Sequence, residues 1–188
     1  GYVVMEPGSG HLACGTSGPG RLPEPEEIFD RFIGCLSPKD LAGKKILVTA
    51  GPTIEPIDPV RFISNPSSGK MGFAVARAAE HRGAEVTLIT GPTHLIDPMN
   101  VTTIRVRSAA EMAHQVFQLM ENVDVIIKSA AVSDYRPKEN KTHKIKKGKS
   151  EMVLRLQQNE DILKTLGQKK KHQVLVGFAA ETKELKKN

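Results

Sequence analysis

The sequence predicts an α/β fold whose core is a doubly wound, mostly parallel sheet, preceded by an irregular Gly/Pro-rich flap and a short helix. Short apolar runs alternate along the chain with segments whose apolar residues recur at helical spacing. The apolar runs are continuous, as in strands buried on both faces of a parallel sheet. Gly or Pro stands at several of the junctions. Strands that alternate with helices in this way favour a parallel sheet covered on both sides.

The first part of the chain differs from the rest in composition. Residues 1–27 are rich in Gly and Pro and have no sustained period, which is typical of a loop or flap. Residues 28–33 then carry apolar side chains at helical spacing, with Glu26 and Glu27 in the expected first turn. We therefore expect a short helix here, followed by a polar connector over residues 37–43.

From residue 44 the pattern becomes regular. Residues 45–50 are an apolar run bounded by Gly51, which predicts the first buried strand. A long loop follows over residues 51–68, and we expect Asn159 to cap the last helix. The other expected elements are helices over residues 71–82, 109–120 and 160–166, and strands over residues 85–90, 101–106, 123–131, 152–156 and 174–178.

This order of elements is Rossmann-like, and it places the ligand site. Ligands of such sheets bind beyond the carboxyl ends of the strands, where the winding direction reverses. The loops expected at that edge are residues 51–72, 91–99, 130–150 and 177–182.

Charge and composition narrow the class of ligand. Lys and Arg outnumber Asp and Glu by 27 to 21, an excess that suits nucleic acid, anionic lipid or phosphorylated small molecules. The chain has no Trp and only 4% aromatic residues, which argues against stacking on nucleic-acid bases. No apolar run approaches the roughly 20 residues that a membrane span needs. Cys14 and Cys35 make no disulfide framework and fit a reducing, cytoplasmic setting.

The end of the first long loop has the composition of an anion site. Ser67, Ser68 and Gly69 precede a helix, so hydroxyls and backbone N–H groups converge on its positive end. The alternative is that a serine only caps the helix. Gly69-Lys70 lacks the following Ser or Thr of a P-loop, and no G-x-G-x-x-G follows the first strand.

The loop after the fourth strand is a second candidate. Ala130 and Ala131 are small enough to allow close approach of a ligand, and Asp134 offers an oxygen for Mg²⁺ or for a ribose hydroxyl. The alternative for Asp134 is an ordinary turn at a strand end.

Two further loops complete the expected edge. Lys144, Lys146 and Lys147 form either a solvated face or a mobile cationic loop that closes over a triphosphate. After the last strand, Gly177 and Ala180 leave space, and Phe178 is free to pack on a base or ribose or within the core.

Together these residues resemble the ligase domain of the bifunctional coenzyme A biosynthesis flavoproteins of bacteria. The resemblance covers residues 44–188, and residues 1–27 resemble the tail of the preceding decarboxylase domain, with Cys14 in its substrate flap and Thr16 where the family usually has Asp. The motifs that carry it are Thr49-Ala50-Gly51-Pro52-Thr53, Glu55, Ile57-Asp58, Val60-Arg61, Asn65-x-Ser67-Ser68-Gly69-x-Met71-Gly72, Ala130-Ala131-Val132-x-Asp134, Lys144-Ile145-Lys146-Lys147 and Gly177-Phe178-Ala179-Ala180-Glu181-Thr182.

The resemblance implies a two-step ligation. The carboxylate of 4′-phosphopantothenate attacks the α-phosphorus of CTP, giving an acyl-cytidylate and pyrophosphate, and the amine of cysteine then displaces CMP. By similarity Lys144 stabilises the first transition state, Asn65 holds the acyl intermediate and Arg61 orders the site. Cys14 is the catalytic cysteine of the decarboxylase flap by the same similarity.

The resemblance also implies the ligands and the organisation of the chain. Residues 1–37 are expected to be the tail of the decarboxylase domain with its linker, and residues 38–188 a C-terminally truncated nucleotide-binding domain. Asp134 is the expected Mg²⁺ ligand, FMN is expected in the longer protein but not on this chain, and the longer protein is expected to be a homo-oligomer without nucleic-acid or membrane partners. The expected nucleotide-binding residues are Gly51, Thr53, Ser67, Ser68, Gly69, Ala130, Ala131, Asp134, Lys146, Lys147, Phe178 and Ala180.

Two other functions stay open at this point. An NAD(P)-dependent oxidoreductase would need a dinucleotide fingerprint and a ribose-reading acid after the second strand, where the chain has Thr90-Gly91-Pro92 instead. A non-catalytic nucleotide-binding fragment is the second alternative, because both ends of the chain read as cut and the family continues after Thr182 with a portion of the nucleotide site. We therefore expect binding, rather than turnover, from this chain alone.

Overall fold

A five-stranded parallel sheet forms the centre of the protein. The structure is a computed structural model that describes residues 2–148 and 151–179. The strand order is β11-β8-β3-β6-β7, and every neighbouring pair is parallel. The strands are β3 (Lys45–Ala50), β6 (Glu85–Thr90), β7 (Thr102–Arg105), β8 (Val125–Lys128) and β11 (Val174–Gly177).

The winding of the chain confirms the predicted fold class. The chain enters the sheet at its centre with β3 and moves outward through β6 to β7. It then crosses to the other side of β3, adds β8 and moves outward to β11. The direction therefore reverses between β3 and β8, and the loops that follow these two strands form the predicted ligand edge.

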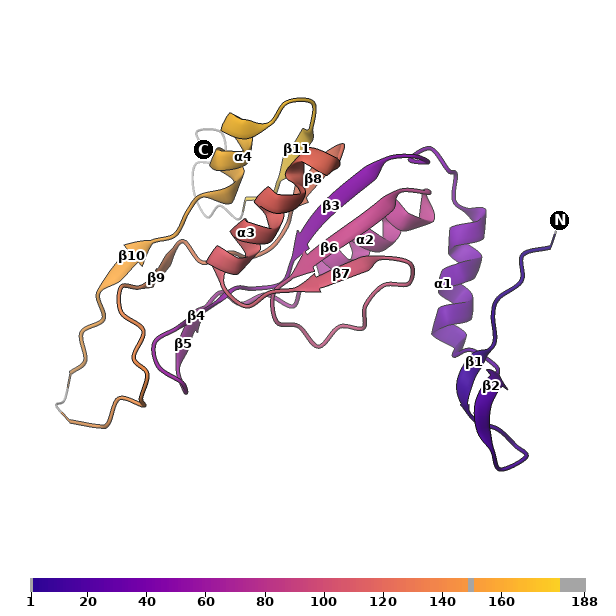
Figure 1. Cartoon of the computed structure of the whole chain (residues 1–188), viewed down its shortest axis with the longest axis horizontal. Helices are drawn as coiled ribbons and strands as arrows, with labels where there is room; N and C mark the ends of the chain where they lie inside the picture. The colour runs from indigo at the N-terminus through magenta and orange to yellow at the C-terminus, as the bar shows by residue number, and fades with distance from the viewer. Residues whose placement is uncertain (1, 149–150, 180–188) are drawn as a thin grey trace.

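Helices cover both faces of this sheet (Figure 1). α2 (Lys70–His81) packs on one face, and α3 (Ala109–Leu119), the 3₁₀ turn η1 (Met120–Asn122) and α4 (Ile162–Lys169) pack on the other. α2 is rich in alanine, and a Cβ on Gly72 would stand 2.5 Å from the Cβ of Ala50, so the helix approaches β3 closely. The predicted helices over residues 71–82 and 109–120 are confirmed.

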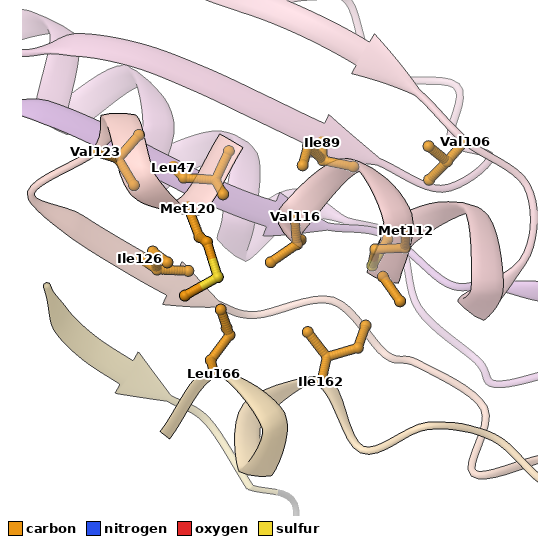
Figure 2. Close-up of a cluster of buried hydrophobic side chains, with 11 residues drawn as sticks. Leu47, Ile89, Val106, Met112, Val116, Met120, Val123, Ile126, Ile162 and Leu166 are labelled. Carbon is orange, nitrogen blue, oxygen red and sulfur yellow. The ribbon is translucent and has the colours of Figure 1, made fainter. Parts of the chain in front are cut away.

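The core divides into one cluster on each face, because successive side chains of a strand point to opposite sides. Within β3, Leu47 belongs to the cluster beneath α3 and α4, whereas Ile46 and Val48 pack beneath α2. Figure 2 shows the first cluster, in which Met112 and Val116 of α3 meet Ile162 and Leu166 of α4 over the sheet. This two-sided burial explains why the strands are continuous apolar runs. The buried residues of the cluster in Figure 2 are Leu47, Ile89, Val106, Met112, Ala113, Val116, Met120, Val123, Ile126, Ile162 and Leu166.

The long loop after β3 contains a hairpin that the sequence analysis left as loop. β4 (Ile54–Pro56) and β5 (Phe62–Ser64) pair antiparallel beyond the carboxyl end of the sheet. Glu55, only 2% exposed, accepts the backbone N–H of Ala109 at 2.8 Å, so a buried carboxylate of β4 caps the first turn of α3. Strands of three residues are too short for an alternation of buried and exposed side chains to be read from the sequence.

A second antiparallel pair extends the same edge and corrects one expected strand. β9 (Tyr135–Pro137) pairs with β10 (Leu156–Gln158), and Figure 1 shows this arm projecting away from the sheet, with the lysine-rich loop at its far end. We expected a strand over residues 152–156. The strand instead begins at residue 156, because pairing to β9, and not the apolar run itself, decides which residues become extended.

The cap of α4 also differs from the expectation. Asp161, not Asn159, is the N-cap, and its carboxylate accepts the N–H of Lys164 at 2.9 Å. Asn159 is occupied elsewhere: its amide donates to the carbonyl of Ser133 at 2.8 Å and its oxygen accepts from Arg136 at 2.7 Å. The helix accordingly runs over residues 162–169 and not 160–166.

The N-terminal part lies at the opposite end of the molecule from the β9–β10 arm (Figure 1). The flap, expected to be irregular, forms an antiparallel hairpin of β1 (Gly8–His11) and β2 (Ser17–Arg21). The predicted short helix is confirmed and is longer than expected, as α1 (Pro25–Leu36). Oδ1 of Asp30 in α1 lies 3.2 Å from Nε2 of His81 in α2, and this contact joins the two helices. Within the described ranges 2–148 and 151–179, no helix is long and apolar enough to cross a bilayer.

Candidate functional site

The turn before α2 is shaped by two left-handed glycines. Gly69 is the N-cap of α2 with φ 77°, and Gly51, after β3, has φ 73°. A Cβ on Gly69 would lie 2.8 Å from Cγ2 of Thr93 and 3.3 Å from the Cα of Gly51, so both ends of the β3–α2 connection crowd against the loop after β6. Only glycine combines this backbone conformation with such close approach.

The serines before α2 bond within the turn. Ser67 Oγ accepts the N–H of Gly69 at 3.3 Å, and Ser68 Oγ lies 3.5 Å from the N–H of Lys70. The N-cap residue itself has no side-chain acceptor, since it is Gly69. These long contacts leave the first amides of α2 weakly satisfied, and a helix of 12 residues carries a partial positive charge at this end. The turn is therefore suited to an anion.

The loops after β3 and β8 are joined backbone to backbone. Ala131 N–H donates to the carbonyl of Gly51 at 2.8 Å, and Ala130 N–H donates to Oγ1 of Thr49 at 3.2 Å. Thr53 donates its N–H to the carbonyl of Ala131 at 3.3 Å. The structure therefore brings Gly51, Ala130 and Ala131 to one edge, as the topology predicts.

Thr53 takes a structural position at this edge. It has no exposed surface, and its Oγ1 accepts the N–H of Ser133 at 3.0 Å. Asn65 is exposed and donates from Nδ2 to the carbonyl of Val132 at 3.1 Å. Both residues fix the loop after β8, but only Asn65 has surface available to a ligand.

Two buried hydroxyls flank the joined loops without a partner among the described residues. They are Oγ1 of Thr93, beside Gly51 and Gly69, and Oγ of Ser133, directly before Asp134. Unsatisfied buried polar atoms are rare in proteins and call for a water, ion or ligand nearby. Sequence reasoning selected the loop of Thr93 but not the residue, because an isolated threonine in a turn has no motif.

Asp134 is exposed, and its backbone carbonyl accepts the N–H of Asn159 at 2.7 Å. The parts of the chain that the structure describes hold no group of three or more His, Cys, Asp or Glu residues placed to enclose a metal. A single carboxylate fits Mg²⁺ nevertheless, because Mg²⁺ commonly takes one or two protein carboxylates and completes its shell with phosphates and water. The assignment of Asp134 to Mg²⁺ stays a prediction.

Lys128 was not predicted from the sequence. It is the last residue of β8, opposite Thr49 of β3 and Gly177 of β11. Burial lowers the pKa of Lys128, against the opposing attraction of Asp161 and Asp134. The available signal was a lysine that ends an otherwise apolar strand at the ligand edge.

The lysine-rich loop of the arm lines a cationic cavity of about 880 Å³. Arg61 reaches it from the β4–β5 hairpin, and its Nη2 donates to the carbonyl of Ile145 at 3.0 Å. None of the residues 67–69 lines this cavity, so the expected closing of the cationic loop over a triphosphate bound at that turn stays a prediction. The lining residues are Arg61, Lys144, Ile145, Lys146, Lys147, Gly148, Glu151 and Met152.

Phe178 and Cys14 are both exposed. Phe178 is 53% exposed, which excludes core packing within the described chain, and its N–H lies 3.3 Å from the carbonyl of Lys128. Ala180 lies outside the described residues. Cys14 belongs to the β1–β2 turn, and its contact with Thr16 at 3.2 Å lowers the pKa of the thiol.

The sequence that builds this edge, turn and arm matches a known protein family. The family model described as the DNA/pantothenate metabolism flavoprotein C-terminal domain matches residues 41–188. This range holds the whole five-stranded sheet, the β4–β5 hairpin and the β9–β10 arm. The chain belongs to this family.

Members of the family include close relatives of this chain. A coenzyme A biosynthesis bifunctional protein CoaBC of Bacillus subtilis is 49% identical over 189 residues, covering 98% of this chain and 47% of the relative. A cysteine/cysteine sulfinic acid decarboxylase from an unknown prokaryotic organism is 50% identical, covering 97% of this chain and 53% of the relative. The chain thus spans about half the length of these relatives.

Solved structures of the family agree with the fold. A crystal structure of the C-terminal domain of a coenzyme A biosynthesis bifunctional protein CoaBC superposes with a TM-score of 0.67 at 56% identity. The match covers 76% of this chain and 67% of that one. A DNA/pantothenate metabolism flavoprotein from Streptococcus pneumoniae matches with a TM-score of 0.63 at 28% identity, over 71% of this chain and 68% of that one.

Proposed function

We propose that this chain is the nucleotide-binding part of a phosphopantothenate–cysteine ligase, within a longer protein of coenzyme A biosynthesis. The observation that carries the proposal is the cationic cavity, where Arg61 and three lysines of the arm surround one space. A polyphosphate that reacts with a carboxylate concentrates negative charge, which such a cavity stabilises. Membership of the family supports the same proposal.

The proposed first step joins a carboxylate to a nucleotide. A carboxylate oxygen of 4′-phosphopantothenate attacks the α-phosphorus of CTP, the bond from that phosphorus to the bridging oxygen breaks, and pyrophosphate leaves. Negative charge spreads over the equatorial oxygens of the five-coordinate phosphorus, where the ammonium of Lys144 stabilises it. Lys146 and Lys147 bind the phosphates from the same loop. Asp134 would hold a Mg²⁺ ion, which would neutralise part of the phosphate charge.

The proposed second step forms the amide. The amine of cysteine attacks the acyl carbon of the acyl-cytidylate, loses a proton, and CMP leaves. Asn65 holds the acyl intermediate, and Arg61 orders the site around it. The first amides of α2, with Ser67, Ser68 and Gly69, bind phosphate oxygens, and Phe178 and Ala180 frame the base.

We assign the remaining parts of the chain by the same proposal. Residues 1–37 are the tail and linker of a decarboxylase part, in which Cys14 would act on the ligation product in a decarboxylation that uses FMN bound elsewhere in the longer protein. The lowered pKa of the Cys14 thiol supports a reactive role for that residue. The small-molecule substrates are CTP, 4′-phosphopantothenate and cysteine, and the intact protein is proposed to be a homo-oligomer.

The test is release of pyrophosphate by the intact protein with CTP and 4′-phosphopantothenate, before cysteine is added. We expect release in the wild type, and a loss of about 10²-fold or more in Lys144→Gln, the scale on which removal of one transition-state charge partner acts. Lys170→Gln is the matched control, since Lys170 is exposed and does not line the cavity. Normal release by Lys144→Gln would remove that residue from the first step.

The second step has its own variant. Asn65→Asp keeps the size of the side chain but places a negative charge beside the acyl intermediate. We expect acyl-cytidylate to accumulate in this variant after cysteine is added, detected by mass spectrometry. Nucleotide binding without any pyrophosphate release in the wild type would instead favour a non-catalytic nucleotide-binding module.

A further inference from the structure

Asp58 is a buried carboxylate between β4 and β5 that accepts five hydrogen bonds. The residue is 3% exposed. Its Oδ1 accepts the N–H groups of Val60 and Arg61, both at 2.9 Å. Its Oδ2 accepts Nε and Nη2 of Arg61 at 3.0 and 2.5 Å and the N–H of Ile145 at 3.1 Å. Burial of this carboxylate is tolerated because both of its oxygens accept hydrogen bonds.

The charge of Asp58 is held by its partners. The hydrogen bond from the Arg61 guanidinium, followed by the backbone N–H groups, holds the pKa of Asp58 far below its usual range. The carboxylate is therefore ionised at neutral pH. Arginine is the cation suited to this position, because its planar fork engages Asp58 through two nitrogens and still reaches a carbonyl with one of them.

These two residues hold a backbone segment that is 84 to 87 positions away in the sequence. The N–H of Ile145 donates to Asp58, and the carbonyl of Ile145 accepts from Arg61. Ile145 stands between Lys144 and Lys146, and it is half-buried where residues 141–144 and 146–148 are exposed. A second tie, from the N–H of Lys141 to the carbonyl of Ile57 at 3.0 Å, anchors the same loop to the same hairpin.

We propose that Asp58 is a positioning residue for the ligation, which sets the place of the Lys144 ammonium by holding the backbone of Ile145. This inference rests on the proposed function of the cavity. A lysine on a freely moving loop loses conformational freedom when its ammonium meets the developing charge. A lysine on a loop that is already tied to the β4–β5 hairpin loses less. Asp58 does not line the cavity and acts through Arg61 and Ile145.

The deciding variant is Asp58→Asn, measured by hydrogen exchange of the intact protein. Asparagine keeps the shape of the side chain. Either its NH₂ group then faces the N–H groups that Asp58 accepts, or its neutral carbonyl oxygen accepts them more weakly than a carboxylate does. We expect the Ile145 amide to exchange at least about 10-fold faster, which corresponds to about 1.4 kcal/mol, while amides of β3 and β6 keep their rates. Asp40→Asn is the matched control, because Asp40 makes a similar two-bond pair with Arg82 on the exposed surface.

The kinetic readout is a double-variant cycle on pyrophosphate release. If Asp58 acts through the loop, Asp58→Asn lowers kcat about 10-fold or more, and adding it to Lys144→Gln causes little further loss, since coupled residues are not additive. Asp40→Asn should leave kcat unchanged. Equal, multiplicative effects of Asp58→Asn in both backgrounds would overturn the positioning role.

A second variant covers the case in which Asp58→Asn fails to fold. Ile145→Pro removes the N–H that Asp58 accepts but leaves the Asp58–Arg61 pair in place, and Thr142→Pro adds a proline to the same loop without removing a hydrogen bond that the structure shows. We expect only Ile145→Pro to lower kcat. A wild type that releases no pyrophosphate would reject the proposed function alone, whereas unchanged exchange at Ile145 in Asp58→Asn would overturn the positioning role itself.

Discussion

At the scale of single residues, a half-buried charge at the sheet edge has neighbours that set its pKa. Lys128 is desolvated at the end of β8, while Asp161 and Asp134 attract its positive charge. The net effect is a pKa below that of an ordinary lysine. Such an amine is unprotonated, and reactive toward electrophiles, in a larger fraction of molecules near neutral pH.

The pKa of Lys128 can be followed by the pH dependence of acylation. We expect its midpoint to fall below about 10.4, the value of a free lysine. Asp161→Asn should lower it further, because it removes an attracting charge while asparagine still caps α4. Peptide mapping by mass spectrometry gives the midpoint, and a midpoint at or above the free value would contradict desolvation as the leading cause.

Asp58 predicts an acid dependence of stability with a definite sign. Its pKa in the folded protein is below that in the unfolded chain, about 3.9. Its contribution is therefore complete above pH 3.9 and decreases as pH falls toward the lower, native pKa. In urea titrations, the difference in unfolding free energy between wild type and Asp58→Asn should be constant from pH 5 to 7 and shrink below about pH 3.9. A difference that grows on acidification would contradict this assignment.

At the scale of secondary-structure elements, two helical glycines have opposite surroundings. Gly72 in the first turn of α2 is buried against β3, where an added Cβ would meet the Cβ of Ala50 at 2.5 Å and Oγ of Ser129 at 2.7 Å. Gly167 in α4 is exposed, and an added Cβ would meet nothing within 4 Å. The first glycine permits close packing of a helix on the sheet, and the second has no such role.

Alanine at these two positions should shift stability in opposite directions. We expect Gly72→Ala to lower the free energy of unfolding by about 1–3 kcal/mol through overpacking. Gly167→Ala should raise it by about 0.5–1 kcal/mol, because alanine loses less backbone entropy in a helix. Urea midpoints at unchanged slope measure both. Stabilisation by Gly72→Ala would mean that α2 stands further from β3.

The helices and strands that the sequence predicted correctly are those whose hydrophobic pattern lies within their own residues. The helices over residues 71–82 and 109–120 and the strand over residues 45–50 follow from their own apolar period. The strand at residues 156–158 and the hairpin of β4 and β5 depend on a partner strand, so the sequence misplaced the first and missed the second. Asn159 looked like a cap by composition, but the folded chain uses it to tie Arg136 to Ser133.

At the scale of the whole molecule, the two core clusters share one sheet. Leu47 belongs to the cluster beneath α3 and α4, and Leu88 to the cluster beneath α2, and neither has exposed surface. The strands β3 and β6 are neighbours in the sheet. Loss of packing on one face therefore weakens the support of the other.

Core truncation on either face should destabilise the same cooperative unit. We expect Leu47→Ala and Leu88→Ala each to lower the free energy of unfolding by about 2–5 kcal/mol, the range for buried leucines. Ile96→Ala, at a position 91% exposed, should stay within about 0.5 kcal/mol of wild type. Calorimetry and circular dichroism should give one transition with coincident midpoints. Two separate transitions would show that the faces unfold independently.

The amino-acid sequence by itself determined the alternation of strands and helices, the doubly wound sheet and the edge at which its loops gather, because hydrophobic period and Gly/Pro punctuation are local. It also named Arg61 and the lysines of the arm, through a family resemblance. Only the tertiary structure decided that Asp58 and Arg61 hold Ile145, and that the cationic cavity lies on an arm outside the sheet. Hydrogen bonds between residues more than 80 positions apart depend on how the chain is brought together in space, and no local pattern encodes them.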